Sequence, residues 1–280
     1  MVQITADTST MLTPRTGAEL GVGIVPLHVT IAGKTYREMD EIFPPEFLRI
    51  IYEGNLPTSS QPSPADMEAL FEKDCARSPV LHISMADGLS GSYASACAMR
   101  ENMPNKEYIT VVNSATLCGP HGVIVRKAHR LAQDGLTVEE ILEGIRPNLE
   151  HSKSFLIPQD FEYLRRGGRL SPAAAKVGSL LRLVPLMTQG EGGRNLEKAG
   201  LCRNFTKAVE KCIESFRRMG VGPDYVISVS HADTFEQGRK AYAMLSDAFP
   251  GAAMELLDLT CAFITQGGPK CVAIQACLRV

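Results

Sequence analysis

The chain has 280 residues, of which 44% are hydrophobic and 21% are charged, and its 29 basic and 31 acidic side chains give a formal net charge of -2. This composition is typical of a globular protein and excludes an intrinsically disordered chain. The balanced charge provides no overall positive field, which argues against a nucleic-acid-binding protein. At roughly 150 residues per domain, the length predicts two domains with a sizeable core.

The cysteines and histidines point to neither a disulfide scaffold nor a metal site. The eight cysteines are spread along the chain without a C-x-x-C pair, and the six histidines show no H-E-x-x-H or other ligand spacing. We therefore expect no metal and no cofactor. The first residues lack a basic flank followed by an apolar stretch, and no window approaches 18 consecutive apolar residues. We predict a cytoplasmic protein without a transmembrane segment.

In the first half of the chain, short apolar runs alternate with amphipathic stretches of helical length, which indicates an α/β architecture. The predicted strands are residues 2–5, 24–31, 80–84 and 108–112. The predicted helices are residues 45–53, 64–76, 93–102 and 122–133. Thr137 and Glu140 have capping-box spacing ahead of a further helix, which we expect to end near Pro147.

The second half begins with a different pattern. Residues 153–157 and 182–187 read as strands, and a glycine-rich turn at 190–193 leads to a polar strand at 195–198, which predicts a hairpin. The remaining predicted elements are helices 205–219 and 234–248 and strands 225–230, 253–258 and 271–278. This change places the domain boundary near His151, with an N-terminal domain of residues 1–151 and a C-terminal domain of residues 152–280.

Residues 56–64, with the sequence L-P-T-S-S-Q-P-S-P, place three hydroxyl side chains between prolines. Proline fixes φ and forbids regular helix, so we expect Thr58, Ser59 and Ser60 on a preformed loop before the next helix. Such a loop presents hydroxyl and amide donors to an anion. A helix cap followed by a linker is the alternative interpretation.

Residues 84–93, S-M-A-D-G-L-S-G-S-Y, connect an apolar strand directly to a helix. The free amides and the dipole of a helix N-terminus favour an anion there, and Ser90, Gly91 and Ser92 add two hydroxyls and close backbone approach. The stretch matches neither the G-x-S-x-G nucleophile elbow nor a Walker loop. Residues 7–9 and 113–114 also follow predicted strands. Parallel strands end at one shared edge, so we expect these loops to converge on one anion site, unless each is only a helix cap.

Residues 163–171, Y-L-R-R-G-G-R-L-S, carry three arginines around two glycines. Arginine offers a planar, bidentate fork to a carboxylate or phosphate, and Arg169 after the glycines is the best placed of the three. A basic surface turn is the alternative.

Taken in order, I-T-x-D-T, P-T-S-S-Q-P-S-P, L-S-G-S-Y, V-V-N-S and Y-L-R-R-G-G-R-L-S resemble the DegV family of bacterial fatty-acid-binding proteins over essentially the whole chain. The resemblance implies an N-terminal parallel-sheet α/β domain, a C-terminal mixed-sheet α/β domain, and a long-chain fatty acid buried between and within them. It implies a lipid-binding protein without catalytic residues. In some family members a separate kinase subunit phosphorylates the bound acyl group, so such a kinase is an expected partner.

The resemblance also implies where the fatty-acid carboxylate binds. The family's hydroxyl, amide and guanidinium positions fall on Ser59, Ser60, Ser90, Gly91, Ser92 and Arg169, with serine replacing the usual threonine at Ser92. One departure is larger. Where the family shows H-T-G-P-G, this chain reads T-Q-G-G-P-K, which aligns Gln266 with the family histidine. Glutamine donates a hydrogen bond but carries no charge near neutral pH, which puts the phosphotransfer role in doubt.

A lipid carrier is the leading hypothesis, and two others stay open. A tail of roughly 14 methylenes at about 0.8 kcal/mol each offers about 11 kcal/mol before ordering costs. Leu180, Leu181, Leu183, Val184 and Leu186 are candidates for the tail pocket or for core packing. An enzyme acting on a small anion with Ser59 or Ser90 as nucleophile is disfavoured, because no motif places a histidine or lysine to activate either serine. A regulatory binding module is the third hypothesis.

Overall fold

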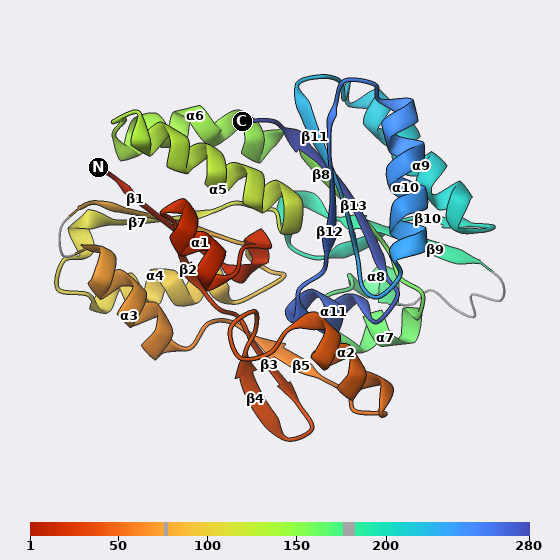
Figure 1. Ribbon diagram of the computed structural model, residues 1–280, viewed down its shortest axis with the longest axis horizontal. Coiled ribbons are helices and arrows are strands. Elements are labelled where there is room, and N and C mark those ends of the chain that lie inside the picture. The colour runs from red at the N-terminus through yellow and green to blue at the C-terminus, as the bar shows by residue number, and fades with distance from the viewer. Residues whose placement is uncertain (76–77, 176–182) are drawn as a thin grey trace.

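The structure is a computed structural model that describes residues 1–75, 78–175 and 183–280 (Figure 1). Its first sheet is entirely parallel, with the strand order β2-β1-β6-β7. These strands are β1 (Gln3–Asp7), β2 (Gly23–Val25), β6 (Val80–Ser84) and β7 (Ile109–Asn113). All five residues of β6 are buried, as expected for a central strand of a sheet covered on both faces.

Helices cover both faces of this parallel sheet (Figure 1). The surrounding helices are α1 (Pro14–Leu20), α3 (Pro64–Cys75), α4 (Ser92–Asn102), α5 (Cys118–Gln133) and α6 (Val138–Glu150). Side chains of α3 and α4 form one buried cluster with the sheet, and those of α5 and α6 form another on the opposite face. Helix α5 also contacts the sheet of the second half, so it lies between the two sheets.

The helix that begins after Thr137 has the predicted capping box but continues through Pro147 to Glu150. The predicted end near Pro147 was therefore wrong. A proline removes one backbone donor, but near the end of a helix this costs a single hydrogen bond and the last turn still forms.

A small antiparallel sheet, β4-β3-β5, projects from the first half, and α2 (Pro44–Tyr52) lies between its strands β4 and β5 along the chain. Its strands are β3 (His28–Ile31), β4 (Lys34–Arg37) and β5 (Thr58–Ser60). The predicted single strand at 24–31 is therefore wrong: β2 ends at Val25, and β3 pairs in a different sheet. Pro26 lies at this break, where its missing N–H interrupts strand pairing.

The predicted loop at Thr58, Ser59 and Ser60 is also corrected by the structure. These residues form β5, which pairs antiparallel with β3, with His28 opposite Ser60. Prolines are tolerated beside an edge strand, and here they flank β5 at positions 57 and 62 rather than interrupting it.

The second half forms a six-stranded mixed sheet with the order β10-β9-β8-β13-β11-β12. Its strands are β8 (Ser152–Ile157), β9 (Val184–Gln189), β10 (Leu196–Cys202), β11 (Tyr225–His231), β12 (Ala253–Asp258) and β13 (Val272–Leu278). The hairpin of β9 and β10 is confirmed, and β11 pairs parallel with β12 while the other pairs are antiparallel. Of the strand predicted at 182–187, position 182 lies outside the described residues, as does position 76 of the helix predicted at 64–76.

Helices α9 (Phe205–Arg218) and α10 (Phe235–Ala248) cover one face of the mixed sheet (Figure 1). Three further helices described in this half were not predicted: α7 (Phe161–Arg166), α8 (Pro172–Ala175) and α11 (Cys261–Gly267). Helix α1 of the first half was not predicted either. Helix α11 follows β12 and contacts α2, α7, β3 and β5, so it joins the mixed sheet to the small sheet. This position makes α11 the centre of the candidate site.

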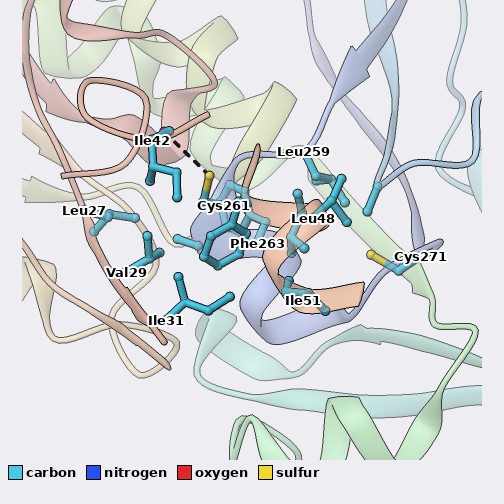
Figure 2. Packing of buried hydrophobic residues seen from close by; sticks show 14 of the residues in the cluster. Leu27, Val29, Ile31, Ile42, Leu48, Ile51, Leu259, Cys261, Phe263 and Cys271 are labelled. Carbon is cyan, nitrogen blue, oxygen red and sulfur yellow. Dashed lines mark hydrogen bonds between the residues drawn. The ribbon is translucent and has the colours of Figure 1, made fainter. Parts of the chain in front are cut away.

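The predicted α/β fold, with a parallel sheet followed by a mixed sheet, is confirmed. The boundary at residue 151 stays a prediction, and one buried cluster contains residues from both sides of it (Figure 2). Within the described ranges, no helix is long and apolar enough to cross a membrane. The same residues contain no group of three or more histidine, cysteine, aspartate or glutamate side chains arranged to hold a metal ion.

Candidate functional site

The loops after the parallel strands converge, but mainly through hydrogen bonds to one another. The buried Asp7 carboxylate accepts from Ser9 N at 2.9 Å and from Met85 N at 3.3 Å. Asn113 Oδ1 accepts from Asp87 N at 3.2 Å, which joins the loops after β6 and β7. Asp7 also caps a short helical turn, so its oxygens are already satisfied. The loop after β6 reaches the cavity described next through Met85 and Leu89, and the loop after β7 reaches it through Leu117.

An apolar cavity lies beside α11, at the junction of the two halves. Its walls are formed by Met85 and Leu89 from the loop after β6, Leu117 before α5, Leu164 of α7 and Phe263 of α11, among others. It encloses about 680 Å³, counting space open to solvent. These walls are mostly apolar, so the space beside α11 favours an apolar group of a ligand.

A polar hollow adjoins this cavity and shares Met85, Leu89 and Phe263 with it. Six of the seven predicted head-group residues line the hollow: Ser59, Ser60, Ser90, Gly91, Arg169 and Gln266. Arg169 and Gln266 also line the apolar cavity, so the two spaces meet at these side chains. The structure thus brings together residues that lie more than 200 positions apart in the sequence.

The seventh predicted residue, Ser92, is fully buried at the start of α4 rather than in the lining of the hollow. Its hydroxyl lies 2.8 Å from Ser90 Oγ, and its backbone N–H donates to the same oxygen at 3.2 Å. Ser92 therefore orients Ser90, which faces the hollow.

Gln266 occupies the last turn of α11 and bridges this helix to β5. Its Nε2 donates to Ser59 Oγ at 2.8 Å. Its Oε1 is buried and meets no hydrogen-bond donor within the described part of the chain. A Cβ on Gly167 would come within 2.6 Å of this Oε1 atom, so the glycine permits α7 and α11 to approach closely. The first glycine of the G-G-R motif thus serves the packing of Gln266.

The second glycine turns the chain so that Arg169 enters the site. Gly168 has a φ of +75°, in the left-handed region that favours glycine. Arg169 Nη1 donates to Gly167 O at 2.6 Å, and its Nε donates to Leu89 O at 3.2 Å. These two carbonyls hold the guanidinium between α7 and the loop after β6.

The charge of Arg169 has no acidic partner in the described residues, where no carboxylate lies within ion-pair distance of it. The side chain is half-buried, and burial lowers the pKa of its guanidinium. Arg169 is also the one charged residue in the described lining of the cavity and the adjoining hollow. A buried charge without a counter-ion is unfavourable, so this position favours an anionic ligand group.

Buried contacts fix α11 at its N-terminus. The Ala262 N–H donates to Glu38 Oε2 at 2.7 Å, and Thr8 Oγ1 donates to the other carboxylate oxygen at 2.6 Å. Burial raises the pKa of Glu38 to about 7. Figure 2 shows Phe263 packed among Val29 of β3 and Leu48 of α2, so hydrophobic contacts also hold the helix in place.

The cavity walls differ from the tail pocket expected from the sequence. Leu186 packs in the core formed with α9, and Leu183 is exposed, so neither lines the cavity. Val184 is partly buried against the same core. Leu180 and Leu181 lie outside the described residues. The lining residues Leu164 and Phe263, by contrast, were not singled out by any sequence motif.

Comparisons with known proteins agree with this fold. The model of a family described as "Uncharacterised protein, DegV family" matches residues 1–279. The DegV domain-containing protein YejH of Lactococcus lactis is 30% identical over 276 residues, which cover 98% of each chain. A DegV family protein of Thermus thermophilus, described as binding a fatty acid, has 28% identity and a TM-score of 0.87, with 99% of each chain covered. A DegV fatty acid binding protein of Bacillus subtilis has 25% identity and the same TM-score and coverage.

Proposed function

The chain belongs to the DegV family, and from this membership and its own site we propose that it binds a long-chain fatty acid as a non-catalytic carrier. The carboxylate binds in the polar hollow to Arg169, Gln266 and the serine hydroxyls, and the tail fills the apolar cavity. The half-buried Arg169 guanidinium, which has no acidic partner in the described residues and lies where the hollow meets the cavity, is the observation that carries this proposal.

The division of roles follows from elementary energetics. Burial of roughly 14 methylenes at about 0.8 kcal/mol each supplies most of the affinity. A buried carboxylate opposes this gain unless several donors meet it. Arg169 offers a charged fork, while Ser59, Ser60 and Ser90 offer hydroxyls, Gly91 an amide and Gln266 the amide N–H groups. The tail therefore sets the affinity and these donors set the orientation.

The hydrogen bonds around the serines favour a carrier over an enzyme with a serine nucleophile. Ser59 Oγ accepts from Gln266 Nε2, and Ser90 Oγ is paired with Ser92. Within the described residues, neither hydroxyl is bonded to a histidine, lysine or carboxylate that would activate it.

We also propose that the protein presents the bound carboxylate to a separate kinase subunit, as the family resemblance implies. Ser60 and Gly91 are exposed at the edge of the hollow, so the head group lies close to the surface. Gln266 in place of the family histidine supplies a hydrogen bond but no proton transfer, so any acid–base step belongs to the partner.

The first experiment is denaturing extraction of the purified protein followed by mass spectrometry of the released lipids. We expect close to one long-chain fatty acid per protein chain. A protein that carries no lipid and also fails to bind added fatty acids would overturn the proposal. Steady hydrolysis of an acyl ester or acyl phosphate that is lost in Ser90→Ala would support the enzyme hypothesis instead.

A second experiment isolates the carboxylate contact by comparing hexadecanoic acid with its methyl ester. We expect wild type to prefer the acid, and Arg169→Gln to weaken acid binding by about 10- to 100-fold, as for the loss of a charge-assisted hydrogen bond. Ester binding should change little. Arg165→Gln is the matched control, because Arg165 is exposed on α7 and is not among the residues that line the cavity or the hollows beside Ser59 and Ser90. Equal losses in both variants, or none in Arg169→Gln, would contradict the assignment.

A further inference from the structure

The six-stranded sheet contributes polar side chains to the cavity wall that are not part of the lining of the polar hollow. Gln275 of β13, Ser154 of β8 and Thr188 of β9 line it, together with the apolar Leu117. Gln275 and Ser154 are direct cross-strand partners, and their exposed fractions are 1% and 7%. A pocket that holds an unsubstituted hydrocarbon tail gains nothing from polar groups at this depth.

The hydrogen bonds of Gln275 leave one acceptor without a partner. Its Nε2 donates to Leu117 O at 3.0 Å and to Ser154 Oγ at 2.8 Å. A backbone carbonyl only accepts, so in a flipped amide Gln275 Oε1 would face the Leu117 carbonyl oxygen and two acceptors would oppose each other. The atom that bonds Leu117 O is therefore Nε2, and the atom without a partner is Oε1. That Oε1 is buried and meets no donor in residues 1–75, 78–175 or 183–280. Thr188 Oγ1 does not supply one, since it donates to Ser154 O at 2.9 Å.

We propose that the cavity is built for a fatty acid whose chain carries a hydroxyl group in its distal part, and that this hydroxyl donates to Gln275 Oε1. This inference rests on the proposed function and specifies its ligand class. Ser154 Oγ accepts from Gln275, so its own hydrogen remains available to the oxygen of the same ligand hydroxyl. The ligand hydroxyl then both donates and accepts. An unsubstituted tail would leave the Gln275 acceptor unpaired in an apolar environment.

The test compares the binding of an unsubstituted fatty acid with derivatives of equal length that carry a hydroxyl at the α, mid-chain or ω position. We expect wild type to bind a mid-chain or ω-hydroxy acid about threefold more tightly than the unsubstituted acid, as for one added hydrogen bond. The α-hydroxy acid should gain nothing, because its hydroxyl lies beside the carboxylate.

Two variants then assign the preference to one atom. Gln275→Met keeps a side chain of similar length without the amide acceptor. It should weaken binding of the preferred hydroxy acid about tenfold and leave the unsubstituted acid within about twofold. Thr188→Val, which removes a hydroxyl from the same wall, is the matched control and should keep the preference.

The outcomes separate this inference from the proposed function. If no fatty acid binds, the proposed function itself fails. If unsubstituted acids bind and no distal hydroxyl improves affinity in wild type, the inference is overturned. This wild-type series decides the matter even if Gln275→Met does not fold. A preference that persists in a folded Gln275→Met variant would also overturn it.

Discussion

Glu38, which accepts a hydrogen bond from the N-terminus of α11, offers a direct test of how burial changes the titration of a carboxyl group. The substitution Glu38→Gln retains a side chain of the same shape whose amide oxygen can still accept from Ala262 N. Its amide NH₂ group can donate to Thr8 Oγ1, which would then act as an acceptor. The variant therefore removes the titration of Glu38 and keeps its contacts, as the protonated carboxylic acid does.

The expected effect on stability follows from the raised pKa. Burial raises the pKa of Glu38 from its ordinary value of 4.5 to about 7, so between these two pH values the folded chain holds a proton that the unfolded chain has released. The wild type therefore loses stability as pH rises from 4.5 to 7. A tenfold difference in proton affinity between the folded and unfolded chain corresponds to about 1.4 kcal/mol, so the loss between pH 5 and pH 8 amounts to about 2–3 kcal/mol. Glu38→Gln lacks this loss.

The measurement is urea denaturation of wild type and variant at pH 5 and pH 8, with unfolding monitored by circular dichroism. The wild-type free energy of unfolding, relative to that of Glu38→Gln, should fall by about 2–3 kcal/mol between the two pH values. The comparison cancels the titration of groups that both proteins share. Glu68→Gln, at an exposed site on α3, is the control and should show no such change. A difference between wild type and Glu38→Gln that is the same at both pH values would refute the argument.

Two further predictions concern the head-group residues. Gly167→Ala places a Cβ within 2.6 Å of Gln266 Oε1, so it should displace Gln266 and weaken fatty-acid binding about tenfold in a binding titration. Gly135→Ala, at an exposed position, is the control and should affect stability alone. Unchanged binding in Gly167→Ala would show that Gln266 is not needed. Gln266→His should leave fatty-acid binding within about threefold and should raise the rate of acyl phosphate formation in an assay with a fatty acid kinase. A rate no higher than that of wild type would show that the residue at position 266 does not limit phosphorylation.

The sequence predicted the elements whose physics is local. The apolar run at Val80–Ser84 and the capping box at Thr137 required no knowledge of the rest of the chain, and both form as expected. Helix α11 escaped prediction because six of its seven residues are buried, which leaves no amphipathic pattern to recognise. Strand β5 escaped because an edge strand of three residues between prolines has the composition of a loop.

The residues of the candidate site also differ in how far the sequence alone could predict them. Motifs point to the proposed head-group residues because glycine, serine and arginine have special backbone or hydrogen-bonding properties, and the bidentate guanidinium singles out Arg169. The apolar walls had no such signal, since Leu164 and Phe263 resemble core residues until the fold leaves a space beside them. The role of Gln275 depends on Ser154 and on the carbonyl of Leu117, neither of which lies near it in sequence.

The charge in this site is carried by a residue that does not titrate near neutral pH. Arg169 is the one charged residue in the described lining of the cavity and hollow, and the family resemblance implies a histidine at the position that Gln266 occupies. A histidine there would add positive charge at acidic pH and lose it above its pKa, whereas glutamine adds none at any pH. In the proposed carrier, the attraction for a carboxylate therefore remains constant across the range in which fatty acids are ionised. We expect selection between an acid and its neutral ester to depend on the Arg169 guanidinium, and selection among acids to depend on the side chains that line the cavity.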